Sequence, residues 1–482
     1  MASLPSSSQD LVVLTPSSPS EFASAITSRC YNAKRPARDC YPDIIFQAKS
    51  VAAVQTAVRY CVDRKLKICV RSGGHNWEGS WLQGSGTALL DVGDLNSIEL
   101  HQADKSVHVG PGATGSAIVQ ALAPHDLFFP GGHCDGVAIG GFLLGGGYGI
   151  GFPKYGMGST WVSQARVVLP DGSVVTASSS HEKSDPKQAA ILHLIRGAYT
   201  AFPGVITSYT LGPSLPTKPK GVMSGTLFYK LTDWPKAFDL AKTIHKDGND
   251  AIEITSVMTY APPAVQEATG ESMVTLLGLM IWGDTPEESW ELWKRYGSTA
   301  EGLLVPPEEM PTQLEAENVP AFFKDLYPSS TRYQTQVFMG DKAFETLQGT
   351  EEMESLIQPL VDMWMSDDKP PAPSHTLLVC VHPNLKSKVH GNQELALGYT
   401  PDMGIQTYAM YTDAGQDDTI KEQLDKAHAK FVECDKFHTS LVEGETKRHG
   451  YESGFACHEA FLKTRQCIQL LDPDGVFAGC PK

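Results

Sequence analysis

The chain has 482 residues, 41% of them hydrophobic and 20% charged, which is the composition of a globular protein of two or three domains. Its formal net charge of −16 at pH 7 argues against nucleic acid or an anionic membrane surface as the main partner. No apolar run approaches the roughly 20 residues that a membrane-spanning helix needs, so we expect no membrane span.

The Ser- and Pro-rich N-terminus lacks the basic region and the apolar core of a secretory signal. We therefore expect a cytoplasmic protein, or a secreted one if a signal has been removed. Ten cysteines follow without a CxxC pair or a regular spacing, which excludes a zinc ribbon, and we predict no metal site. Cys30 and Cys40 would pair in an oxidising compartment, whereas free and mostly buried thiols are the expectation without a signal.

Short strands and a few helices make up the first half of the chain. Residues 41–70 have the pattern of strand, helix, strand, with Val51, Val54, Val58 and Cys61 on one face of the helix. The further predicted elements are strands within 86–100, 106–112 and 203–211, a helix at 115–122 and a hairpin at 164–178.

The first strand–helix–strand unit ends in the sequence "VRSGGHNW", Val70 to Trp77. Gly73 and Gly74 free the backbone for a sharp turn and a close approach to a ligand. His75 would then lie on a loop whose N–H groups suit an anion such as a phosphate. The alternative is a hairpin turn with an incidental histidine.

A G-x-G-x-x-G pattern follows at Gly110, Gly112 and Gly115, between a predicted strand and a predicted helix. Pro111 stiffens this loop, and the preceding strands lack the βαβ order of a dinucleotide-binding fold. We interpret the pattern as a strand–turn–helix joint.

Residues 129–151 form a second loop, with ten glycines in 23 positions. Such density weakens helices and strands, and it suits close packing of backbone against a pyrophosphate or the edge of a heterocycle. A flexible linker is the alternative, but the apolar residues of the loop argue against it, namely Val137, Ile139, Phe142, Leu143 and Leu144.

The second half mixes strands with longer helices, which predicts an open antiparallel sheet covered by helices on one face. The expected strands lie at 224–231, 252–262, 273–282 and 403–413, and the expected helices at 285–304 and 417–433. We place a domain boundary near Lys218. This gives one domain at 1–217, a second at 218–445, and a tail at 446–482 that returns to the first.

Together, the two loops resemble those of the FAD-linked oxidases related to berberine bridge enzyme, within the vanillyl alcohol oxidase/p-cresol methylhydroxylase superfamily. The resemblance covers about the first 215 residues, including 196–211, which is similar to a further flavin-contacting strand. It implies an α+β fold with a two-part FAD-binding domain of the p-cresol methylhydroxylase type and a substrate domain. It also implies FAD bonded through its 8α-methyl group to His75 and through C6 to Cys134.

The same resemblance implies further cofactor-binding residues, most of them in the two loops. They are Val70, Arg71, Ser72, Gly73, Gly74, Asn76, Gly136, Val137, Gly140, Gly141, Gly146, Tyr148, Gly149, Gly204, Val205 and Ile206. Val137 occupies the position that lines the oxygen path in the family, where valine is compatible with an oxidase.

The catalytic residues depart from the family pattern. The strand that usually offers a glutamate or tyrosine is "GIQTYAMYTD", and the family's C-terminal Y-x-G-x-N segment is absent. Tyr408 and Gln406 share one face of this strand and are our candidates, with His133 as a group that could polarise the site. The alternative for Tyr408 is packing in the core.

These features predict an FAD-dependent oxidase that removes hydride from a C–H bond next to oxygen or nitrogen in a small secondary metabolite, with O2 as acceptor and release of H2O2. One alternative is a carbohydrate oxidase. Another is a flavin-bound protein without redox turnover that assists a redox-neutral cyclisation. The expected partners are a small-molecule substrate and molecular oxygen.

Overall fold

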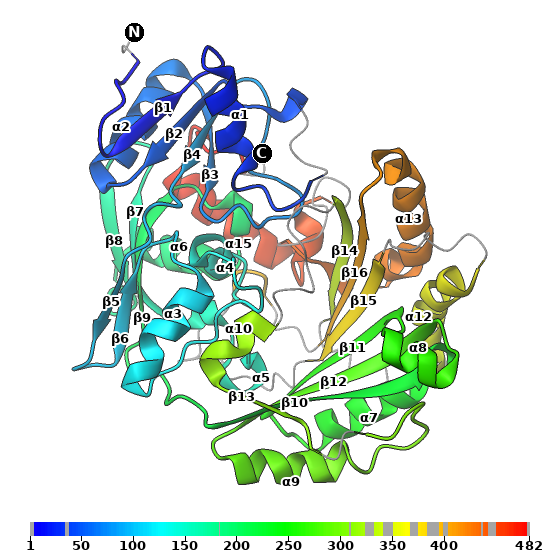
Figure 1. The fold of residues 1–482 in the computed structure, drawn as a ribbon. Coiled ribbons are helices and arrows are strands. Elements are labelled where there is room, and N and C mark those ends of the chain that lie inside the picture. The colour runs from blue at the N-terminus through cyan, green and yellow to red at the C-terminus, as the bar shows by residue number, and fades with distance from the viewer. Residues whose placement is uncertain are drawn as a thin grey trace.

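The computed structural model describes residues 4–33, 38–182, 184–307, 310–322, 332–340, 350–366, 375–382, 395–398, 403–434, 437–441 and 450–479. In these residues two smaller sheets occupy one side of the molecule and a large sheet occupies the other (Figure 1). No helix in these ranges is both long and apolar enough to cross a membrane.

The first sheet has the order β1-β2-β4-β3, in which β2 and β3 pair parallel to β4, and β1 pairs antiparallel to β2. Its elements are β1 (Leu11–Leu14), α1 (Pro19–Thr27), β2 (Ile44–Ala48), α2 (Val51–Arg64), β3 (Lys67–Arg71) and β4 (Thr87–Asp91). The predicted strand, helix and strand at 41–70 are confirmed. Ser50 caps α2 by accepting from the Ala53 N–H, and Val54, Val58 and Cys61 are buried on its inner face.

The second sheet is antiparallel, with the order β5-β6-β9-β7-β8. Its elements are β5 (Ile98–His101), β6 (Ser106–Val109), α3 (Gly115–Leu122), α4 (Ile139–Leu144), α5 (Phe152–Tyr155), β7 (Val162–Val168), β8 (Val174–Ser178), α6 (Pro186–Ile195) and β9 (Val205–Leu211). The predicted hairpin is β7–β8. Since β6 pairs antiparallel with both neighbours, the G-x-G-x-x-G pattern joins a strand to a helix outside any βαβ unit, as expected.

The large sheet has eight antiparallel strands in the order β13-β10-β12-β11-β15-β16-β14-β17. They are β10 (Gly221–Lys230), β11 (Ile252–Tyr260), β12 (Met273–Gly283), β13 (Thr312–Leu314), β14 (Arg332–Gly340), β15 (His375–His382), β16 (Met403–Tyr411) and β17 (Phe437–Thr439). Around it lie α7 (Trp234–Lys246), α8 (Pro263–Thr269), α9 (Pro286–Tyr296), α10 (Val319–Phe322), α12 (Thr350–Met365) and α13 (Asp417–Glu433).

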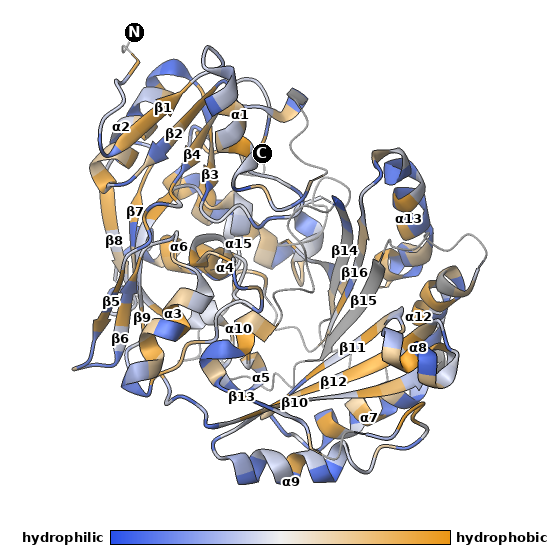
Figure 2. Ribbon diagram, viewed as in Figure 1, coloured by the Kyte–Doolittle hydropathy of each residue, from blue (hydrophilic) through white to orange (hydrophobic). Residues whose placement is uncertain are grey.

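Helices α7, α9, α12 and α13 bury their apolar sides against one face of the large sheet. Trp293 of α9, for example, is fully buried beneath β10. Hydrophobic residues dominate β12, whereas hydrophilic residues recur along α9 (Figure 2). The predicted α+β class, with an antiparallel sheet covered by helices on one face, is confirmed. Part of the opposite face packs through Met280 and Trp282 against Phe128 and Tyr155.

The C-terminal segment returns to the two smaller sheets. Helix α15 (His458–Leu471) packs against α6, and the backbone beyond it pairs with β3. The Ile68 N–H donates to Val476 O at 2.9 Å, and the Ala478 N–H donates to Ile68 O at 2.9 Å. Strand β9 of the second sheet ends at Leu211, and β10 of the large sheet begins at Gly221. The chain therefore passes from one sheet to the other between these two residues. The division into 1–217 and 218–445 stays a prediction.

Candidate cofactor and active site

A cavity of about 710 Å³ lies between the two glycine-rich loops and the face of the large sheet opposite α7, α9, α12 and α13. The loops contribute residues 72–77 and several residues between 132 and 148. The sheet contributes Ser224 and Thr226 from β10, Glu253, Thr255, Val257 and Thr259 from β11, Leu276, Gly278, Leu279 and Met280 from β12, and Gly404 and Gln406 from β16. A volume of this size suits a cofactor or a small ligand.

The first loop requires its glycines. Gly74 has φ +71°, and a Cβ there would lie 1.8 Å from the Arg29 carbonyl oxygen. A Cβ on Gly140 would come within 2.9 Å of the Ser72 hydroxyl, so the second loop needs glycine where it crosses the first. The second loop therefore packs closely against the first at Gly140 and Ser72.

His75 extends from this loop into the cavity lining. Its Nε2 is buried and makes no hydrogen bond to any of the described residues. Burial lowers the pKa of the imidazole from 6.5 to about 4, so the ring is neutral at physiological pH. A neutral imidazole with an unpartnered buried nitrogen keeps a lone pair available for bond formation.

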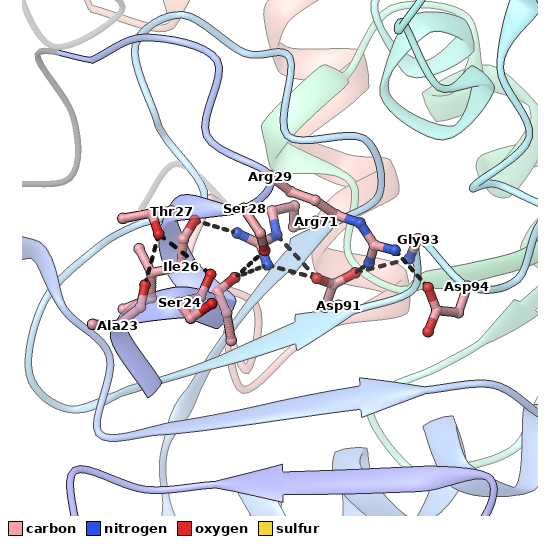
Figure 3. Close-up of polar contacts among 11 residues, drawn as sticks. Ala23, Ser24, Ile26, Thr27, Ser28, Arg29, Arg71, Asp91, Gly93 and Asp94 are labelled. Carbon is pink, nitrogen blue, oxygen red and sulfur yellow. Dashed lines mark hydrogen bonds and ion pairs between the residues drawn. The ribbon is translucent and has the colours of Figure 1, made fainter. Parts of the chain in front are cut away.

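The guanidinium of Arg71, four residues earlier, is held by a buried network (Figure 3). Its guanidinium donates to Asp91 at 2.6 Å and to the carbonyls of Ala25 and Ile26 at 2.6 and 3.0 Å. Asp91 also pairs with Arg29 at 2.8 Å. Because these acceptors engage the Arg71 guanidinium, the charged group fixes α1 to β3.

His133 and Glu253 form a polar pair between the second loop and the large sheet. Glu253 is 4% exposed, and its Oε1 is hydrogen-bonded to His133 Nε2. Its Oε2 accepts from the Gly151 N–H at 2.8 Å and from Trp282 Nε1 at 3.2 Å. Both members of the pair line the cavity. Sequence reasoning missed Glu253, although an acidic residue inside the apolar strand "IEITSVMTY" was a signal.

Side chains of the large sheet form the floor of the cavity, and they alternate along each strand between the cavity and the helices. In β16, Gln406 lines the cavity, whereas the Thr407 hydroxyl turns to the helices and pairs with His428 Nε2 of α13 at 2.7 Å. Tyr408 follows two residues after Gln406 in the same strand, and its side chain lies outside the described residues. Gly278 of β12 is paired with both Thr226 and Thr255, which leaves a hollow between two hydroxyl-bearing side chains.

Most of the residues predicted for the site come together at this cavity. Those that line it are Val70, Arg71, Ser72, Gly73, Gly74, His75, Asn76, His133, Cys134, Val137, Gly140, Gly141, Tyr148, Gly204, Ile206 and Gln406. Four predicted cofactor residues lie outside the lining: Gly136, Gly146, Gly149 and Val205. Val205 is buried in the core of the first sheet, and a Cβ on Gly149 would lie 2.2 Å from the Pro130 carbonyl oxygen, so both have a packing role; their contact with a cofactor stays a prediction.

A flavin fits these residues on two observations. Gly141 lines the cavity, and because the nearest atom to a Cβ there would be Tyr199 Cε2 at 4.0 Å, a side chain at this position would take up space open to a ligand; His75 offers a buried nitrogen in the same lining. Cys134 lines the same cavity. This arrangement agrees with the FAD-binding domain that the sequence predicts.

Comparisons with known proteins agree. The family model described as "FAD binding domain" matches residues 42–178. "FAD-linked oxidoreductase pynB" of Aspergillus niger is 34% identical over 171 residues, which span 36% of this chain and 30% of that protein. "Berberine bridge enzyme-like 17" of Arabidopsis thaliana is 34% identical over 200 residues, 40% of this chain and 36% of the relative. Residues 42–178 thus match an FAD binding domain, and the resemblance of the chain to the berberine bridge enzyme-like, FAD-linked oxidoreductases is confirmed.

The likeness of fold extends over the whole chain. The crystal structure of 6-hydroxy-D-nicotine oxidase from Arthrobacter nicotinovorans matches with a TM-score of 0.78 at 20% sequence identity. This match covers 100% of this chain and 99% of that one. At this identity the match defines the fold alone.

Proposed function

We propose that the protein is an FAD-dependent oxidase that removes hydride from a C–H bond next to oxygen or nitrogen in a small secondary metabolite. The observation that carries the proposal is a cavity lined by His75, Cys134 and His133 on one side and by side chains of the large sheet on the other. Bound FAD would supply the hydride-accepting chemistry and transfer the electrons to O2, with release of H2O2.

His75 and Cys134 are the proposed attachment points. Attachment at His75 joins an imidazole nitrogen to the 8α-methyl carbon, with one hydrogen lost from each and both passed to O2 as H2O2. Attachment at Cys134 joins sulfur to C6, with loss of the thiol and ring hydrogens in the same way. The neutral state of the buried imidazole supports the first bond, because a protonated ring has no lone pair at that nitrogen.

Oxidation next to a hydroxyl or amine also frees a proton, which a side chain at the cavity must accept. Arg71 is paired with Asp91, burial gives His75 a pKa of about 4, and burial raises the pKa of Tyr148. His133 is better suited, since the Glu253 carboxylate, held by two N–H donors, would stabilise the imidazolium that forms. Tyr408, with Gln406 beside it, is the alternative acceptor.

A carbohydrate is the second candidate substrate, and one observation favours it. Ser224, Thr226, Thr255 and Thr259 place a row of hydroxyl groups on the sheet face of the cavity. Such groups both donate to and accept from the hydroxyls of a sugar. A secondary metabolite with several hydroxyl or carbonyl groups would meet the same row.

Two experiments test the proposal. His75→Ala and Cys134→Ala should each keep FAD attached after denaturation, and the double variant should release it, as measured by intact-protein mass. Flavin extracted by acid from the unmutated protein would exclude both links.

The second experiment adds candidate substrates anaerobically: glucose, chitobiose, 6-hydroxynicotine and a panel of phenolic and terpenoid alcohols. At least one of them should bleach the flavin absorbance. Bleaching by none, with tight binding of one, would favour a protein without redox turnover.

A further inference from the structure

A short N-terminal segment, Arg29 to Asn32, lies directly against the His75 loop; we call it the strap. The Tyr31 N–H donates to Gly74 O at 3.4 Å, and the Asn32 side-chain amide donates to Trp77 O at 2.7 Å. Arg29 anchors the start of the strap through Asp91 at 2.8 Å and Asp94 at 2.5 Å, as Figure 3 shows. The strap is therefore fixed at both ends to the same loop and strand.

The strap places an aromatic ring on the imidazole. The Tyr31 ring stacks on His75 with centroids 4.0 Å apart and planes 29° apart, and the Trp77 ring lies parallel to Tyr31 at 6.1 Å. Tyr31 also lies within electrostatic range of Cys134, whose charge adds to burial in raising the pKa of the phenol. Tyr31 thus contacts one proposed attachment point and lies within electrostatic range of the other.

Stacking fixes the plane of an imidazole that lacks a hydrogen bond at Nε2. A ring free to rotate about its side-chain bonds would spend little time with its lone pair directed at the methyl carbon, and orientation of this kind controls the rates of bond formation. We infer that Tyr31 is a positioning residue, which holds the His75 imidazole in the orientation required for covalent attachment of the flavin. This inference rests on the proposed attachment through His75.

The test isolates the His75 link in the Cys134→Ala background and measures covalent and total FAD by intact mass and by absorbance before denaturation. Adding Tyr31→Leu removes the ring and should lower the covalent fraction roughly tenfold or more while total bound FAD stays the same. Tyr31→Phe keeps the ring and should restore the covalent fraction to within about twofold of the parent. Tyr60→Leu, which removes a half-buried tyrosine ring on α2, is the matched control and should have no effect.

The possible results distinguish failure of the role of Tyr31 from failure of the proposed attachment through His75. If Cys134→Ala with Tyr31 intact carries no covalent flavin, the His75 link fails and the inference fails with it. If that protein is flavinylated and Tyr31→Leu is flavinylated equally, the inference alone is overturned. If Tyr31→Leu does not fold, Tyr31→Met, which keeps an apolar side chain without a ring, replaces it with the same expected and contrary results.

Discussion

Arg71 is buried at the end of β3, His75 is half-buried with its Nε2 inside the protein, and their surroundings give them different roles. Arg71 has a carboxylate and two carbonyls as partners, so its charge is retained and its function is structural. At His75 burial is the dominant influence, and the pKa falls to about 4. A neutral nitrogen at the cavity wall is the state that covalent attachment requires.

The pH dependence of attachment follows from that value. Protonation removes the lone pair, so a pKa lowered from 6.5 to about 4 extends the reactive range towards acid. In Cys134→Ala apoprotein mixed with FAD, we expect a covalent attachment rate that is nearly constant from about pH 8 to about pH 5 and declines as pH approaches about 4. Time-resolved mass spectrometry measures the rate. A midpoint near 6.5 would mean that the imidazole is solvated before attachment.

Glu253 allows a second test at the scale of one residue. Glu253→Gln keeps the size of the side chain but removes the charge that would stabilise a protonated His133. We expect the rate of flavin reduction by a substrate found in the bleaching panel to fall about 10²-fold or more, with flavin content unchanged. Stopped-flow absorbance is the measurement, and the surface variant Glu287→Gln is the control. An unchanged rate would direct attention to Tyr408.

The sequence predicted the parts of the site that are local. His75, Cys134 and the glycines around them are recognisable because each loop carries its own motif within a few residues. Glu253 and Tyr31 acquire meaning through partners on other elements, and the folded structure was needed to bring Glu253 to His133 and Tyr31 to His75. No pattern in one sequence encodes such pairings.

Helices and strands were likewise predicted where their signal is local and missed where it depends on distant partners. Strands with clear alternation or apolar runs, such as β10, β11 and β12, were predicted near their observed bounds, whereas the predicted helix at 285–304 ends at Tyr296. Gly297 follows Trp293 so closely that its Cβ would lie 2.4 Å from the indole, and the chain leaves the helix there. Strands β14 and β15 were not anticipated, because their position in the sheet depends on pairing with β16 and β11.

A buried ion pair between Arg71 and Asp91 joins β3 to β4. Asp91→Ala would leave the Arg71 guanidinium, 0% exposed, without its carboxylate. We expect a loss of about 3–5 kcal/mol in the free energy of unfolding, measured by urea denaturation. The double variant Arg71→Met, Asp91→Leu should recover much of this loss, because it removes both charges. Equal stability of Asp91→Ala and the unmutated protein would mean that water replaces the carboxylate.

For the whole molecule, the return of the C-terminal segment links distant parts of the chain. Phe477 is 4% exposed in the core of the first sheet, and it also lines the cavity. Phe477→Ala should destabilise the protein by about 3–5 kcal/mol, seen as a lower melting temperature in calorimetry. Leu470→Ala, at a position 47% exposed on α15, is the control and should leave the melting temperature unchanged. Equal melting temperatures for both variants would show that the tail is dispensable.

The contact between the tail and β3 also sets an order of events during synthesis. Lys67 and Gly475 are hydrogen-bonded although 408 positions separate them. At about 5–20 residues per second, the ribosome makes the second partner on the order of tens of seconds after the first. The edge of β3, and the loop that carries His75, therefore stay incomplete until residues 475–478 have been translated. Covalent capture of a flavin at His75 would thus mark chains whose synthesis has passed this point, and nascent or truncated chains would be left unlabelled.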